Sequence, residues 1–128
     1  MIYLETSVAL AHLLAEDRCP PSSMWARELV TSRLLEVELW QRLHERGLGA
    51  THADPARLLL ARLSWLEPVR PVLERALHPF PVPVRTSGAV HLASVSFLRE
   101  RGLAVELATY DEDLAAAARG MGVPIAAV

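Results

Sequence analysis

The apolar positions of this chain fall into short β-prone runs, separated by longer segments that begin with helix-capping residues. The run Met1–Leu4 predicts a strand, and a cap at Thr6 or Ser7 predicts a helix that continues to about Asp17. Further strands are expected at residues 30–31, 67–69, 104–108 and 124–128. Further helices are expected at residues 24–29, 34–46, 54–65, 72–77, 86–101 and 111–120.

Glycine and proline mark the boundaries of these elements. Gly47 and Gly102 follow two of the expected helices, at the place where glycine commonly ends a helix. The pair Asp54-Pro55 has the cap-then-proline pattern of a helix start. The alternation of strands and helices predicts an α/β fold with a parallel sheet covered on both faces. No linker is long enough to divide residues 1–128, so we expect a single domain.

Carboxylates follow three of the expected strands. Glu5 ends the first strand, Glu36 and Glu38 lie early in the helix after the second, and residues 111–113 are all acidic. Ligands of open α/β sheets bind beyond the carboxyl ends of the strands, where these side chains are expected. Convergent carboxylates with no lysine nearby are typical of sites for Mg²⁺ or Mn²⁺.

The composition of the 128 residues excludes several other kinds of site. All 13 basic residues are arginine, which excludes a Walker A loop, a Schiff-base lysine and a receiver-type phosphorylation site. One cysteine, Cys19, excludes an internal disulfide framework. The net charge of −2 gives no general attraction to nucleic acid, so any such contact needs a local arginine cluster. No apolar run spans a membrane and no signal peptide is visible, so we expect a cytoplasmic protein.

Four segments together carry a family resemblance, and they are Met1–Leu10, Ser32–Leu39, Arg85–Ser94 and Ala108–Leu114. In order and spacing they resemble the four motif blocks of the PIN-domain family, most closely its bacterial VapC-type toxins. The resemblance implies a three-layer PIN-like fold with a four- to five-stranded parallel sheet. It also implies a metal-dependent ribonuclease that is dimeric and paired with an antitoxin.

Carried over residue by residue, the resemblance assigns an acidic site with two departures. Glu5 stands where the first block has an aspartate, Glu38 matches the glutamate of the second block, and Asp111 matches the aspartate of the fourth. The acid of the third block is replaced by Gly88. We therefore predict that Glu5, Glu38 and Asp111 are the catalytic residues and the ligands of Mg²⁺ or Mn²⁺.

Several alternatives remain open at this level. Helical periodicity does not separate Glu38 from Glu36, and only the family match favours Glu38. Asp111 is also a good N-cap for the helix that follows it. Asp113 lies about 200° farther around that helix, so we do not expect it to bind the cation directly alongside Asp111. It can still act on the site indirectly, from outside the set of direct ligands. Gly88 is either a tolerated helix glycine or the mark of a site with much-reduced metal affinity.

Polar residues near the acids also have two interpretations. The hydroxyls of Thr6, Ser7 and Thr109 either hydrogen-bond a carboxylate or cap helices and strand ends. The histidines lack paired metal-ligand spacing, and His91 is interpreted as a packed structural residue. Three arginines form either a phosphate-binding rim or a solvated face, and they are Arg85, Arg99 and Arg101.

The sequence therefore leaves two candidate functions. The first is a metal-dependent endoribonuclease toxin that cleaves RNA, forms a homodimer and binds an antitoxin in a groove near the helices from Met24 and Asp54. The second is a catalytically inactive PIN-like module that binds an antitoxin or RNA, which the loss of an acid at Gly88 favours.

Overall fold

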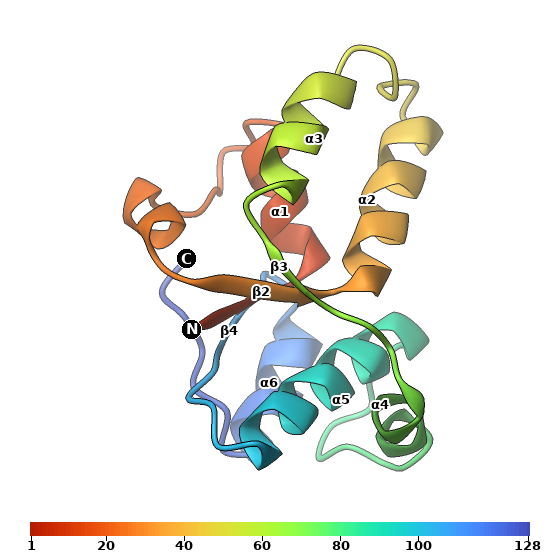
Figure 1. Ribbon diagram of the computed structural model, residues 1–128, viewed down its shortest axis with the longest axis vertical. Coiled ribbons are helices and arrows are strands. Elements are labelled where there is room, and N and C mark those ends of the chain that lie inside the picture. Colours follow the sequence, from red (N-terminus) through yellow and green to blue (C-terminus); the bar gives the residue numbers. More distant parts are fainter.

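The computed structural model describes all residues, 1–128, as three layers with a four-stranded parallel sheet in the middle (Figure 1). The strand order is β3-β2-β1-β4, so β1 is a central strand. The strands are β1 (Ile2–Leu4), β2 (Leu29–Ser32), β3 (Ser64–Leu66) and β4 (Glu106–Ala108). This architecture confirms the predicted α/β fold with its parallel sheet.

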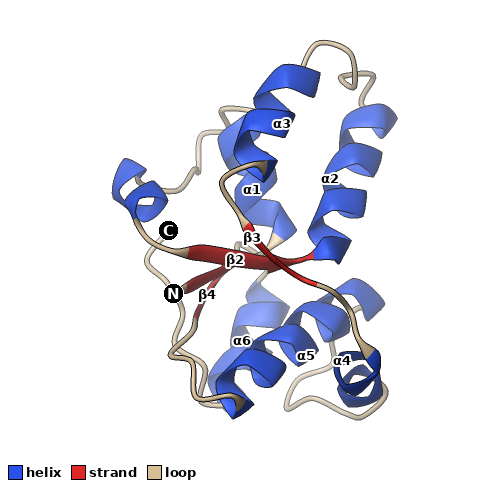
Figure 2. Ribbon diagram, in the orientation of Figure 1, coloured by secondary structure: helices blue, strands red, loops and turns tan.

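Helices cover both faces of the sheet (Figure 2). One face carries α1 (Thr6–Leu13), α2 (Arg33–Glu45) and α3 (Ala53–Leu60). The other carries α4 (Arg70–Ala76), α5 (Thr86–Glu100) and α6 (Glu112–Gly120). A short 3-10 helix, η1 (Ser22–Ala26), precedes β2. No helix is both long enough and apolar enough to cross a membrane.

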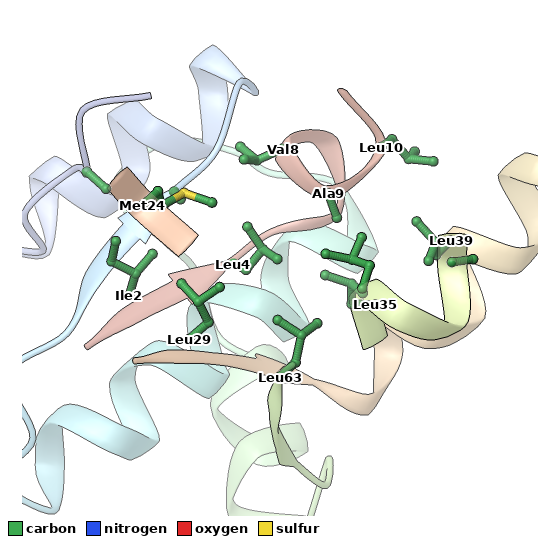
Figure 3. Packing of buried hydrophobic residues seen from close by; sticks show 14 of the residues in the cluster. Ile2, Leu4, Val8, Ala9, Leu10, Met24, Leu29, Leu35, Leu39 and Leu63 are labelled. Carbon is green, nitrogen blue, oxygen red and sulfur yellow. The ribbon is translucent and has the colours of Figure 1, made fainter. Parts of the chain in front are cut away.

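Alternation along β1 divides the buried side chains between two cores. Ile2 and Leu4 pack with leucines of α2, among them Leu35 and Leu39, in the cluster beneath α1–α3 (Figure 3). Tyr3 points to the opposite face and belongs to the cluster beneath α5 and α6. Because successive side chains of a strand point to opposite faces, three residues suffice to anchor β1 in both cores. The residue after β1 is therefore held firmly.

The structure corrects the predicted position of the third strand. The sequence pattern indicated residues 67–69, with Trp65 still in the preceding helix, whereas β3 is Ser64–Leu66 and pairs with β2. Pro68 has no N–H to donate to a strand ladder, which disfavours the predicted segment. The indole ring of Trp65 instead lies beneath the guanidinium of Arg33, 4.4 Å from it.

Two terminal segments also differ from the prediction. Residues 124–128 form only an isolated bridge, Leu107 with Ile125, rather than a fifth strand. Pro124 contributes its carbonyl to that pairing but lacks an N–H, and β4 is only three residues long. The first helix ends at Leu13 rather than near Asp17, and its N-cap is Glu5 rather than a hydroxyl residue.

Candidate active site

Glu5, Glu38 and Asp111 line one cavity of about 160 Å³ at the carboxyl end of the sheet. Glu5 directly follows β1, and Asp111 follows β4 by three residues. Glu38 lies in the second turn of α2, which begins where β2 ends. The parallel topology thus places all three predicted carboxylates at the same end of the molecule.

Glu5 is buried and is held by hydroxyl groups. Its Oε2 accepts hydrogen bonds from the backbone N–H and the hydroxyl of Ser7 and, at 2.8 Å, from the hydroxyl of Thr109. The same hydroxyl of Thr109 accepts the N–H of Asp111. The loop after β1 and the loop after β4 are therefore tied together through one carboxylate oxygen.

Glu38 is held from two other elements. Its Oε1 accepts hydrogen bonds from Thr6 of α1 at 2.8 Å and from His91 of α5 at 2.7 Å. Burial acts to raise the pKa of Glu38, but the interactions with His91, Thr6 and Arg42 outweigh burial and hold the pKa below its usual range. Glu38 is therefore an anion at neutral pH, as a metal ligand must be.

Asp111 has the cap role that the sequence predicted. Its Oδ1 accepts the N–H groups of Asp113 and Leu114 at 3.0 and 3.1 Å and so begins α6. The side chain is exposed at the rim of the cavity. Capping uses one carboxylate oxygen and leaves the other free, so the cap role is compatible with ligation.

The three carboxylates share a pattern that suits a hard divalent cation. Each uses one oxygen to accept protein hydrogen bonds, while Oε1 of Glu5, Oε2 of Glu38 and Oδ2 of Asp111 accept none. However, no three acidic, histidine or cysteine side chains lie close enough to hold an ion directly together. The donor set therefore fits a cation that keeps several of its waters, as Mg²⁺ usually does.

The neighbouring acids lie outside this cavity. Glu36 points away from it and pairs with Arg33 at 3.0 Å, so the helix geometry separates Glu36 from Glu38 where periodicity did not. Asp113 lines an adjoining cavity of about 350 Å³. Gly88 and Asp111 both line the two cavities, and Gly88, at the start of α5, contributes no carboxylate to either.

Two arginines give the acidic cavity a positive edge. Arg85 lines both cavities and makes no ion pair, and Arg42 lines the acidic one. Of the three arginines considered as a phosphate rim, only Arg85 is at this site. Arg99 instead donates to the carbonyls of Met121 and Gly122, and Arg101 lies over the ring of Phe97.

Sequence reasoning missed the contact that His91 makes with the site. The side chain is 1% exposed, as expected of a packed residue, but it also joins Glu38 to Tyr3. Burial raises the pKa of Tyr3 far above its usual range, so its hydroxyl keeps its proton. Long-range contacts of this kind leave no trace in local spacing. The only available signal was a histidine three residues after Gly88, on the same helix face.

Comparison with known proteins supports the resemblance found in the sequence. No family model matches the chain. The chain is 29% identical over 133 residues to a protein named ribonuclease VapC35 from two strains of Mycobacterium tuberculosis, and the match covers 99% of this chain and 96% of the relative.

Two solved structures share the fold. VapC20 of Mycobacterium tuberculosis, described as a Sarcin-Ricin loop cleaving toxin, has a TM-score of 0.68 and 20% identity, with 91% of this chain and 95% of that chain covered. A toxin-antitoxin complex from Klebsiella pneumoniae has a TM-score of 0.64 and 14% identity, with 90% and 91% covered. The four motif blocks, the three-layer fold and the nearly full-length relative agree, and all three make the chain similar to VapC-type PIN-domain proteins.

Proposed function

We propose that this protein is an endoribonuclease toxin that hydrolyses RNA phosphodiester bonds with Mg²⁺ or Mn²⁺ held by Glu5, Glu38 and Asp111. The observation that carries the proposal is the single cavity in which three carboxylates each keep one oxygen free. The nearly full-length similarity to a protein named ribonuclease VapC35 supports it.

In the proposed reaction, the cation and the side chains of this protein have different roles. A bound divalent cation supplies charge neutralisation and lowers the pKa of a coordinated water. Ser7 and Thr109 fix Glu5, and Thr6 and His91 fix Glu38, so the carboxylates need no reorganisation when the substrate enters.

Arg85 is the residue we assign to the RNA phosphate. Its guanidinium lines the acidic cavity and the adjoining one, and no carboxylate in the protein neutralises it. A planar guanidinium suits a phosphate geometrically, and its charge offsets the repulsion between RNA and the three acids. Because the net charge of the chain gives no general attraction to RNA, such a local contact is needed.

The second candidate is an inactive PIN-like module. It is favoured by Gly88, which removes one carboxylate, and by the absence of a group of three side chains close enough to hold an ion directly. Such a module would keep the fold and the partner surfaces but would bind divalent cations no better than an ordinary acidic surface.

RNA cleavage with purified protein separates the two functions. We expect slow cleavage with Mg²⁺ or Mn²⁺, none with a chelator, and loss of cleavage in Asp111→Asn, because asparagine still caps α6 but lacks the charge. Glu36→Gln is the matched control, since Glu36 points away from the cavity. Cleavage that persists in the chelator, or in Asp111→Asn, would reject the proposed reaction, and no cleavage at all would favour the module.

We also propose an antitoxin partner and a homodimer. The structural similarity to a toxin-antitoxin complex supports the first. A groove of about 320 Å³ lies between α1 and α3, where Leu58 is 71% exposed, close to the surface indicated by the sequence. For the homodimer, we expect sedimentation at micromolar concentration to give twice the chain mass of 14.1 kDa. A monomer under those conditions would reject it.

A further inference from the structure

We propose that Tyr3 and His91 are positioning residues that fix the orientation of Glu38 through a directed line of buried hydrogen bonds. The inference rests on the proposed function only in that it gives Glu38 a role in the acidic cavity. The line itself is a property of the folded chain, and it joins three elements, β1, α5 and α2.

The line runs through the least accessible part of the molecule. Tyr3 is fully buried and His91 is 1% exposed. The Tyr3 hydroxyl lies 2.8 Å from Nδ1 of His91, and Nε2 of His91 lies 2.7 Å from Oε1 of Glu38. The two rings meet edge to face, with their centroids 5.7 Å apart. Water is excluded from this region, so each polar atom depends on its protein partner.

The carboxylate of Glu38 sets the direction of the hydrogens in the line, and a backbone N–H completes its far end. The N–H of Ser32 donates to the oxygen of Tyr3 at 3.2 Å. The ionised carboxylate of Glu38 can only accept, so Nε2 of His91, 2.7 Å from Oε1, is the nitrogen that carries a hydrogen, and in that tautomer Nδ1 accepts the hydroxyl hydrogen of Tyr3. The hydrogen of the imidazole is therefore on Nε2, where it donates to Glu38. The opposite tautomer would place a lone pair against the carboxylate.

This direction determines which oxygen of Glu38 is available. Oε1 accepts from both His91 and Thr6, while Oε2 receives no hydrogen bond from the protein. The carboxylate cannot rotate without breaking both bonds, so Oε2 stays available to the cavity that Glu38 lines. Groups that orient a ligand in this way typically change metal affinity by about 10- to 100-fold when they are replaced.

Two substitutions of His91 distinguish positioning from mere packing. The amide of glutamine in His91→Gln reaches the place of Nε2 and can still donate to Glu38. The shorter amide in His91→Asn reaches only the place of Nδ1 and cannot. We expect the Mn²⁺ affinity of His91→Asn to fall at least about tenfold and that of His91→Gln to stay within about threefold of the wild type. His78→Asn, at an exposed histidine, is the surface control.

Imidazole ¹⁵N NMR tests the line without any metal or activity. We expect the hydrogen of His91 on Nε2 in the wild type and in Tyr3→Phe, where Glu38 still accepts it, and we expect the ¹⁵N shift of Nδ1 to change in Tyr3→Phe because the hydroxyl group is lost. If the wild type carries the hydrogen on Nδ1, the proposal is wrong. Equal Mn²⁺ affinities in the two His91 variants also overturn it. If neither variant folds, the tautomer measurement decides. If the wild type binds no Mn²⁺ while the tautomer is as expected, the proposed function fails and the line stands.

Discussion

Short polar side chains do much of the ordering at this site. From the sequence, the hydroxyls of Thr6, Ser7 and Thr109 suit helix caps and strand ends as well as carboxylate contacts, and in the structure all three donate to acidic residues. The cap of α1 is instead Glu5, which accepts the N–H of Ser7. Spacing could not predict this exchange of roles, because it depends on which loops meet at the end of the sheet.

Gly88 provides the sharpest test at the scale of one residue. A carboxylate there would add a full negative charge beside the cavity, so we predict that Gly88→Asp raises Mg²⁺ affinity and RNA cleavage at least about tenfold, or about 1.4 kcal/mol of binding. Glu5→Asp alone should change both less. Calorimetric titration and a cleavage assay measure the two effects.

The packing around Gly88 defines the control for that substitution. A Cβ at this position would lie 3.1 Å from Cδ1 of Leu114, so the leucine must shift by a few tenths of an ångström. Gly88→Asn imposes the same crowding without the charge. Equal metal affinity in Gly88→Asp and Gly88→Asn would show that the matched site is wrong or already compensated.

His12 gives stability a pH dependence of known sign. Burial, and then the charge of Arg62, lower the pKa of His12 from 6.5. The unfolded chain therefore binds this proton at higher pH than the folded chain, so stability falls as pH falls through 6.5. Urea unfolding at about pH 7.5 and at about pH 5.5 measures the free energy of unfolding at each pH. Its decrease between the two should be smaller in His12→Gln than in the wild type. An identical decrease in the free energy of unfolding in the wild type and in His12→Gln would contradict the role of His12.

At the scale of one element, α2 has a core face and a solvent face. Leu35, Leu39 and Leu43 are completely buried, whereas Val37 is 58% exposed. Leu39→Ala should lower the free energy of unfolding by about 2–5 kcal/mol, because it leaves a cavity beneath α1–α3. Val37→Ala should change it by no more than about 0.5 kcal/mol. If denaturant unfolding gave equal losses of stability in Leu39→Ala and Val37→Ala, the assignment of Leu39 to the core face and Val37 to the solvent face would be wrong.

Elements with strong local signals could be predicted, and those set by distant partners could not. The helix Thr86–Glu100 begins where expected and ends within one residue of the expected Arg101, just before Gly102, whose φ is +85°. The segment Ser64–Leu66 is a strand because it pairs with β2, and its own residues also suit a helix. The predicted strand at the carboxyl terminus failed for a similar reason, since β4 pairs there with Ile125 alone.

At the scale of the whole molecule, the parallel sheet is what assembles the site. Glu5, Glu38 and Asp111 are far apart in the sequence, yet strand direction alone brings them to one end. The order of strands could therefore predict the end of the sheet at which these acids lie, but only the family match favoured Glu38 over Glu36. The sequence could not predict that Thr6 and His91 hold Glu38, because side chains from separate layers meet only in the folded protein.

The most direct test of the proposed metal site is a Mn²⁺ titration of the metal-free protein followed by electron paramagnetic resonance. We predict one weak site per chain that is lost in Glu5→Gln, Glu38→Gln and Asp111→Asn. Glu36→Gln should leave it unchanged, because Glu36 pairs with Arg33 outside the cavity. Mn²⁺ binding that survives in all three variants, or a wild type that binds none, would contradict the assignment of these carboxylates to a single metal site.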